Sequence, residues 1–163
     1  MSYINAIKFY DFRQESSTTS QVISTTLTEL SGSRFSYIPK NSKNKVLISF
    51  TQLFRPTPDW DTEMECKIQE STDNFISDIH DVSGSHTRIQ ALGPDSGATY
   101  NGADHWFFEN DHLFEGWNGK KYFRVMLKSS QTTSEFTTQA TNTWNASYPN
   151  NASPPVSITI KEF

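Results

Sequence analysis

The chain has 163 residues, a formal net charge of −4, and a composition that is 34% hydrophobic and 13% aromatic. This length fits one domain with a two-layer core, and 12 Phe, 6 Tyr and 4 Trp can bury much apolar area despite the modest aliphatic content. The negative charge and scattered lysines argue against a nucleic-acid partner, and no apolar run reaches the roughly 20 residues that a membrane helix needs.

Residues 1–20 are set apart from the rest of the chain. The aromatic-rich run Tyr3–Phe12 precedes a polar tract, Gln14–Gln21, that has neither helical nor strand periodicity. One interpretation is an edge strand followed by a loop. The other is an N-terminal arm that attaches the protein to a partner, with the polar tract as tether. The apolar residues of that arm would be Tyr3, Ile4, Ile7, Phe9, Tyr10 and Phe12. The start of the chain lacks the features of a secretion signal.

The segment Ile23–Phe54 predicts three strands in close succession. A Thr-rich first strand is interrupted by Leu30–Ser33, and a second extended run, Arg34–Ile38, is stopped by Pro39. The apolar run Val46–Phe50 then follows a polar loop. No domain linker follows Gln21, so we expect a single domain over residues 21–163.

Further strand patterns follow along the chain. Thr62–Gln69 alternates most regularly, with Met64, Cys66 and Ile68 on one face. Other predicted strands are Phe75–Asp81, Thr87–Leu92, His105–Phe108, the alternating run around Phe123–Leu127, and Val156–Lys161. The stretch Gln131–Pro155 is rich in Ser, Thr and Asn and indicates a long connection that can include strand.

The dipeptide Asn118–Gly119 predicts a tight β-hairpin turn, because Asn-Gly tolerates the positive φ angles of a type I′ turn. No segment shows a helical period over three turns. Many short strands without helices predict an all-β fold, an antiparallel β-sandwich, and the long connections favour a jelly roll.

Residues able to carry chemistry do not form a recognisable motif. The histidines His80, His86, His105 and His112 lack metal-ligand spacing, so we interpret them as surface residues. No nucleophile elbow or phosphate loop is present, and the single cysteine, Cys66, fits a core position. The sequence therefore predicts a protein that is not an enzyme and holds neither a metal nor a cofactor.

Aromatic residues in predicted loops suggest a binding role. Trp117 at the hairpin tip, with Trp144 and Tyr148 in the late loop, could stack on sugar rings beside neighbouring Asn side chains. The competing interpretation is that these rings pack between subunits or cover an end of the core. A carbohydrate- or receptor-binding module, with a host surface glycan as ligand, is the alternative function.

The segment Ile23–Leu30, Gly32–Ser33, Phe35–Pro39 and Lys45–Phe50 resembles a pattern in virion proteins of tailed phages. In these fibre, knob, collar and head-decoration proteins of marine and cyanobacterial phages, the pattern begins a jelly-roll domain of the tumour-necrosis-factor type. The closing strand Val156–Ile160 ahead of Phe163 resembles the terminal strand of that domain.

The resemblance implies a structural protein of the virion surface or an appendage, assembled in the host cytoplasm. It implies a homo-oligomer, a trimer, that contacts other capsid or tail proteins. Only about twenty residues precede the pattern here, so a small decoration or knob protein is favoured over a long fibre. Neither a nucleic acid nor a membrane is an expected partner.

Overall fold

The computed structural model describes residues 8–13, 21–56, 62–91, 106–129, 136–138 and 157–163. Within these residues every regular element is a β-strand, and none is a helix long and apolar enough to cross a membrane. The strands form two antiparallel sheets, called sheet I and sheet II below. The predicted all-β sandwich is confirmed.

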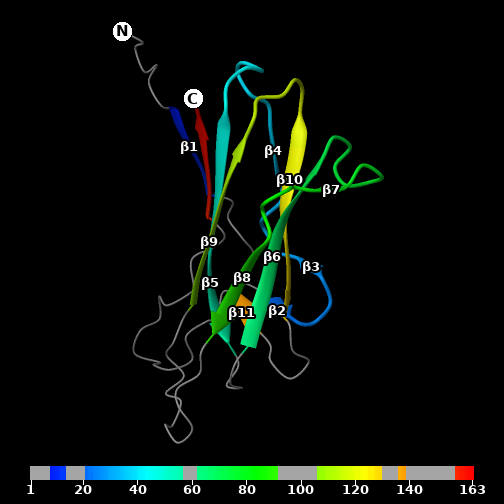
Figure 1. Ribbon diagram of the computed structural model, residues 1–163, viewed down its shortest axis with the longest axis vertical. Coiled ribbons are helices and arrows are strands. Elements are labelled where there is room, and N and C mark those ends of the chain that lie inside the picture. Colours follow the sequence, from blue (N-terminus) through cyan, green and yellow to red (C-terminus); the bar gives the residue numbers. More distant parts are fainter. Residues whose placement is uncertain (1–7, 14–20, 57–61, 92–105, 130–135, 139–156) are drawn as a thin grey trace, which may run out of the picture.

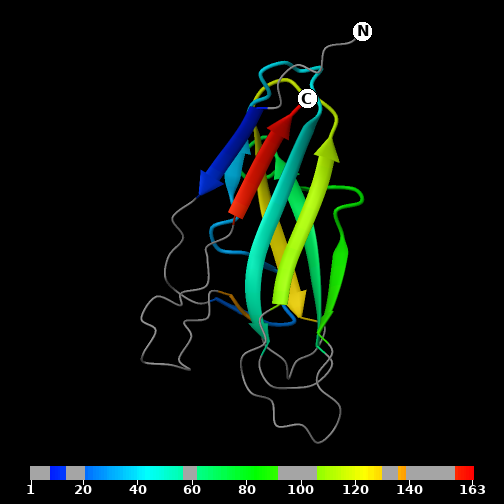
Figure 2. The same cartoon turned by 90° about the vertical axis from the view of Figure 1, so that its left-hand side faces the viewer.

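Sheet I is a long sheet centred on β5. Its strands are β1 (Lys8–Arg13), β12 (Ser157–Glu162), β5 (Val46–Pro56), β9 (Trp106–Phe114), β11 (Phe136–Thr138) and β2 (Gln21–Ile23). β12 and β9 pair with opposite edges of β5, and Figure 2 shows β1, β12, β5 and β9 side by side.

Sheet II is centred on the pair β10 and β6. Its strands are β3 (Thr28–Glu29), β4 (Phe35–Tyr37), β10 (Lys121–Ser129), β6 (Thr62–Ser71), β7 (His80–Asp81) and β8 (Thr87–Ala91). The two sheets lie face to face as the two layers of Figure 1.

The pairing order is that of a jelly roll. The strand pairs are nested in sequence order, each pair lying between the members of the previous one: β1 pairs with β12, β4 with β10, β5 with β9, and β6 with β8. This nesting corresponds to one long antiparallel ribbon that is rolled up so that successive strand pairs alternate between the two sheets. The jelly roll predicted from strand count and connection length is therefore correct.

The core lies between the sheets and follows from the strand alternation. Ile48 and Phe50 of sheet I meet Ile68, Phe123 and Val125 of sheet II, and all five side chains are fully buried. Met64, Cys66 and Ile68 share the buried face of β6 as predicted, and the single thiol is a core residue. Burying such side chains contributes roughly 1.5–3 kcal/mol each to the hydrophobic driving force.

The predicted hairpin at Asn118–Gly119 is wrong. β9 belongs to sheet I and β10 to sheet II, so residues 115–120 cross from one layer to the other. Gly119 has φ +80°, whereas Asn118 is not among the residues with positive φ, so the two positive φ angles of a type I′ turn are absent here. The Gly119 signal was real, but local turn chemistry cannot distinguish a hairpin from a crossing between layers.

Gly116 in the same crossing is a point of close backbone contact. A Cβ atom built at this position would lie 2.2 Å from the Ser42 carbonyl oxygen and 2.5 Å from that of Asn44. Only a residue without a side chain lets the crossing pack against residues 41–45.

Within the N-terminal segment, Lys8–Arg13 forms β1, which lies at one end of sheet I among the described strands. β1 pairs with β12 from Lys8 opposite Glu162 to Arg13 opposite Ser157. The proposed arm residues Phe9, Tyr10 and Phe12 thus belong to sheet I, whereas Tyr3, Ile4 and Ile7 lie outside the described residues.

Candidate functional site

The most distinctive surface feature is the segment Thr72–Ile79, called the 72–79 loop, which joins β6 to β7. In Figure 1 this green loop extends beyond the edge of sheet II. Its Ile76 side chain is 83% exposed and Ile79 is 43% exposed. The tip of the loop therefore presents an exposed aliphatic side chain to solvent.

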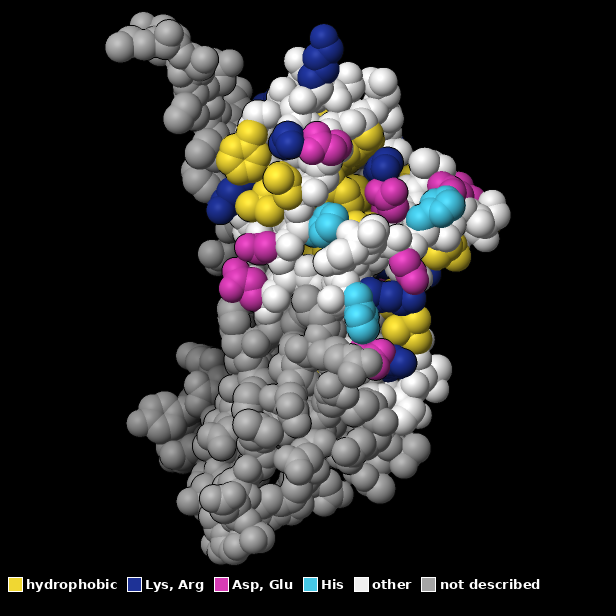
Figure 3. All heavy atoms as spheres, viewed as in Figure 1, with side chains coloured by type: hydrophobic (Ala, Val, Ile, Leu, Met, Phe, Trp, Pro, Cys, Tyr) yellow, Lys and Arg dark blue, Asp and Glu magenta, His cyan; other side chains and the backbone are white. Residues whose placement is uncertain are grey.

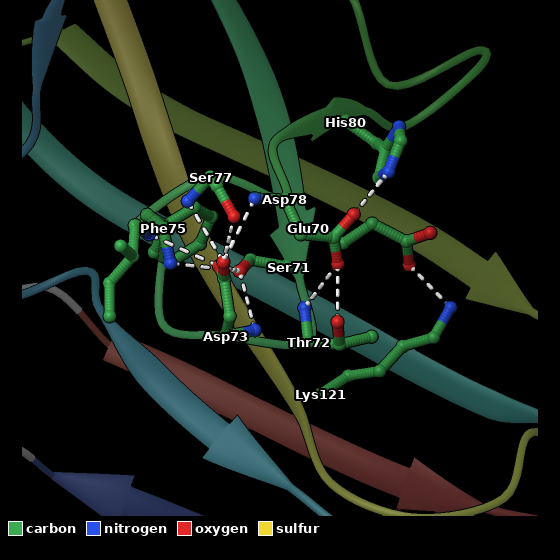
Figure 4. Close-up of polar contacts among 10 residues, drawn as sticks. Glu70, Ser71, Thr72, Asp73, Phe75, Ser77, Asp78, His80 and Lys121 are labelled. Atoms are coloured by element: carbon green, nitrogen blue, oxygen red, sulfur yellow. Dashed lines mark hydrogen bonds and ion pairs between the residues drawn. The ribbon is translucent and has the colours of Figure 1, made fainter.

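The carboxylate of Asp73 organises the loop from within. Its Oδ2 accepts hydrogen bonds from the Ser77 amide (2.8 Å), the Ser77 hydroxyl (2.7 Å) and the Asp78 amide (3.0 Å). Its Oδ1 accepts from the Ser71 hydroxyl (2.9 Å) and the Ile76 amide (3.1 Å), as Figure 4 shows. The Ser77 hydroxyl and these further donors hold the pKa of Asp73 well below its usual range.

A second carboxylate, Asp78, closes the base of the loop. The amide and hydroxyl of Thr72 donate to its Oδ2 at 2.7 and 2.5 Å, and the His80 ring nitrogen lies 2.5 Å from its Oδ1 (Figure 4). The Thr72 hydrogen bonds, with the His80 contact, lower the pKa of Asp78. The lowered pKa values favour the ionised carboxylates, which are the forms that accept all of these hydrogen bonds.

The backbone at the start of the loop is strained. Asn74 and Phe75 have φ angles of 62° and 65°, a region that bulky residues such as Phe rarely adopt. The Phe75 ring is held in place by two guanidinium groups, Arg124 at 4.2 Å and Arg34 at 5.1 Å from the ring centroid.

The two arginines are themselves anchored on sheet II. Arg124 donates to Gln69 Oε1 at 2.8 and 2.9 Å and to Glu29 at 3.0 Å, while Arg34 donates to Glu29 at 2.9 and 2.5 Å. The strained loop is therefore fixed to the sheet at its root, and its tip is left exposed.

The predicted strand Phe75–Asp81 is wrong apart from β7, His80–Asp81. The run Phe75–Ile79 lies in the 72–79 loop, where side-chain acceptors take up the backbone amides that a strand would need for its neighbour. The turn residues Asp73, Asn74 and Asp78 are the signal in the sequence that could have indicated a loop.

A pocket of about 420 Å³ opens between sheet II and the segment Asp81–His86. It is lined by Leu27, Glu65, Cys66, Lys67, Asp81, Val82, Ser83, Gly84, His86 and Lys128. Its charged walls form two ion pairs, Lys67 with Asp81 at 2.6 Å and Lys128 with Glu65 at 2.8 Å. His86 lies 3.6 Å from the same Glu65 carboxylate.

On the face shown in Figure 3, charge of both signs is mixed over the described residues. In Figure 3 acidic, basic and histidine side chains alternate with hydrophobic ones and do not gather by sign. Among the described residues no group of three His, Cys, Asp or Glu side chains is arranged to hold a metal ion.

Trp117 was predicted at an exposed hairpin tip, but in the structure it is partly buried against the core. Its ring packs on the core cluster, with ring centroids 5.6 Å from Phe123, 6.0 Å from Phe114 and 6.2 Å from Tyr37. The Lys121 ammonium lies 5.5 Å from the centroid of the indole ring, and the buried indole Nε1 has no hydrogen-bond partner among the described residues. Trp117 thus covers an end of the core, the competing interpretation above.

The other two residues predicted to contact glycans, Trp144 and Tyr148, lie outside the described residues. Both the 72–79 loop and the pocket were missed in the sequence, the loop although its turn residues are local, and the pocket because its lining comes from segments far apart in the chain.

No protein-family model matches the chain, and no curated protein matches it. Among solved structures, a chain from "Structure of infectious bursal disease virus Gx strain" is similar over 97% of this chain at 10% identity and a TM-score of 0.43. This chain covers 38% of that chain's length. Similarity at this level identifies neither a family nor a function, so the proposals below rest on the chain's own residues.

Proposed function

We propose that this protein is a non-enzymatic structural component of a tailed-phage virion, self-associating as a trimer. Its place would be on the particle surface, as a capsid decoration, a knob or part of a fibre. The proposal joins the sequence resemblance to the architecture and to the apolar side chains exposed on ordered surfaces.

The main support for the proposal is the position, in the fold, of the two segments that resemble the phage virion pattern. The segment Ile23–Phe54 and the closing strand are separated by about a hundred residues in the chain. In the fold, β12 pairs with β5 from Ser157 opposite Thr51 to Glu162 opposite Val46. Two separate parts of one pattern thus become neighbouring strands of one jelly-roll sheet, which supports a common origin for the pattern over chance matches.

Attachment to the particle is assigned in this proposal to β1. Among the described strands β1 pairs only with β12, so its other edge offers backbone donors and acceptors to an added strand. A strand from a capsid or tail protein that pairs with this edge would extend sheet I. The N-terminal segment would then act as an edge strand and not as a free arm.

Two measurements test the proposal. Sedimentation velocity of the full chain is expected to give three times the chain mass, and a monomer at all concentrations up to about 100 μM would overturn the trimer. Mass spectrometry of purified phage particles is expected to detect the chain, and its absence from particles would overturn the virion role.

The attachment strand is tested by two truncations. Removing residues 1–20 deletes β1 and is expected to abolish incorporation into particles, whereas removing residues 1–7 leaves β1 and should preserve it. Both products should keep the near-UV circular dichroism of the folded domain. Incorporation of the longer truncation at the level of the intact chain would exclude β1 as the attachment element.

A further inference from the structure

We propose that Ile76 on the 72–79 loop of one copy inserts into the pocket beside Leu27 and Val82 of the next copy. This inference rests on the proposed self-association and names its contact. No residue of the 72–79 loop lines the pocket, so every copy has both halves of the contact.

The loop is suited to insertion because it is ordered before any partner arrives. Asp73 and Asp78 fix its backbone, and the Arg34 and Arg124 side chains fix its root through Phe75. Binding by a preorganised loop avoids most of the conformational entropy lost when a mobile loop becomes ordered. At 83% exposed, Ile76 has the largest exposed fraction among the exposed large apolar side chains of the described residues.

The pocket is suited to an uncharged aliphatic side chain. Lys67 is paired with Asp81, and Lys128 with Glu65, so the charged walls are neutralised in place. Leu27, which is 38% exposed, and Val82 supply apolar lining. An aliphatic group can enter without leaving a new unpaired charge, whereas a charged ligand would have to compete with an existing ion pair.

Charge around the two surfaces is complementary on one wall of the pocket. The 72–79 loop contains two carboxylates and neither lysine nor arginine. On the pocket wall that holds Glu65, the cationic Lys128 and the imidazole of His86 are 38% and 52% exposed, while the Glu65 carboxylate is only 18% exposed. This wall therefore presents nitrogen donors to an acidic loop, whereas the other wall presents the Asp81 carboxylate, which is 55% exposed and paired with Lys67.

A contact between two different surfaces of identical chains can build a closed ring of copies. When a projection on one surface fits a recess on another, the contact is heterologous and closes as a cycle if the rotation between copies allows. A trimer of this kind uses each loop and each pocket once.

The experiment uses Ile76→Ser, which removes the inserted side chain, and Leu27→Ser, which removes apolar lining from the pocket. Ile38→Ser is the matched control, since Ile38 is 54% exposed and belongs to neither the 72–79 loop nor the pocket. Sedimentation of each full-length variant gives its association constant. We expect each of the first two to weaken association by at least about tenfold and the control to change it by less than about twofold.

An equimolar mixture of the two weakened variants provides the decisive measurement. The Leu27→Ser chain keeps an intact loop and the Ile76→Ser chain keeps an intact pocket, so the mixture contains one complete contact per pair. We expect heterodimers in the mixture at concentrations where each variant alone is monomeric.

Other outcomes separate the two proposals. If the wild-type chain associates and Ile76→Ser associates equally well, the Ile76 contact is wrong while self-association stands. If the wild-type chain is a monomer throughout, the proposed trimer fails and this inference with it. If both variants are weakened but their mixture forms no heterodimer, the two surfaces do not meet each other and the proposed contact is overturned.

Discussion

The Tyr37 hydroxyl donates a 2.6 Å hydrogen bond to Glu162, which joins β4 of sheet II to the last strand of sheet I. Asn44 Nδ2 and the Asn41 amide donate to the other carboxylate oxygen at 2.8 and 3.2 Å. Burial raises the pKa of Glu162, but the hydrogen bonds from Tyr37, Asn44 and loop amides together outweigh it and leave the pKa below its usual value.

Tyr37→Phe should lower the free energy of unfolding by about 1–3 kcal/mol at pH 7, because a buried carboxylate loses a donor. The folded pKa of Glu162 is depressed, so its contribution is present above the unfolded pKa of about 4.3 and is lost as pH falls through the folded value. Urea unfolding at pH 7 and pH 3 measures both effects. The control is Tyr122→Phe on β10, and an equal loss there would contradict a specific role for the Tyr37 bond.

Asp73→Asn should loosen the 72–79 loop without unfolding the sandwich. The neutral amide replaces one acceptor oxygen by a donor, so the Ser77 and Asp78 amides lose their partner. We expect hydrogen exchange at these two amides to accelerate by at least about tenfold, with core strands unchanged. Asp111→Asn, an exposed position on β9, is the matched control and should leave loop exchange as it is.

The same carboxylate predicts how the loop responds to acid. The pKa of Asp73 is depressed, so the loop should remain ordered as pH falls through the ordinary Asp value of about 3.9 and loosen only below it. Carbon-13 titration of the Asp73 carboxyl group measures the midpoint. A midpoint at or above about 3.9 would show that the Ser77 and Asp78 hydrogen bonds do not persist in solution.

Gly116→Ala should destabilise the fold by about 1–3 kcal/mol, because the added methyl group would collide with the Ser42 and Asn44 carbonyls. Gly119→Ala is the informative comparison: a Cβ atom added there would meet no described atom within 4 Å, and only its φ of +80° disfavours alanine. We expect a loss of about 1 kcal/mol there. Thermal and urea unfolding of both variants would compare the two, and a larger loss at Gly119 would contradict the close contact at Gly116.

Trp117→Ala should lower the free energy of unfolding by about 2–4 kcal/mol, since the ring packs against Phe114, Phe123 and Tyr37. Trp117→Phe should lose less, because it keeps aromatic packing and removes a buried N–H that lacks a partner in the described part of the chain. Denaturant unfolding measures both. An alanine variant as stable as the wild type would instead fit a ring that is free to stack on a sugar.

Strands of the sandwich could be predicted from the sequence where apolar and polar residues alternate regularly. β6 and β10 were recognised because Met64, Cys66, Ile68, Phe123 and Val125 recur at every second residue and all become buried. β5 continues to Pro56, beyond the predicted end of its apolar run. Periodicity identifies a strand's buried face but does not fix its end, which depends on how far the neighbouring strands β9 and β11 extend.

The candidate site was much less accessible to sequence reasoning. Phe75–Asp81 was predicted as a strand, yet the conformation of Phe75–Ile79 is set by the Asp73 and Asp78 carboxylates and by Arg124, which reaches Phe75 from β10. Trp117 looked exposed because its neighbours in sequence are turn residues. Its burial depends on Tyr37, about eighty positions earlier in the chain. For Trp117, and for the contact of Arg124 with Phe75, the partners are far apart in sequence, whereas the Asp73 and Asp78 hydrogen bonds are local.

The pairing of Lys8 with Glu162 has a consequence for redesign of the chain. Because the first and last strands of the described body are antiparallel neighbours, a short Gly-Ser linker can connect Phe163 back to Lys8. New termini can then be opened at the exposed Asn118–Gly119 bend, between strands of different layers. Circular permutation at such a site keeps every strand whole. A peptide fused to the new termini would then lie at the crossing between the sheets and not beside β1.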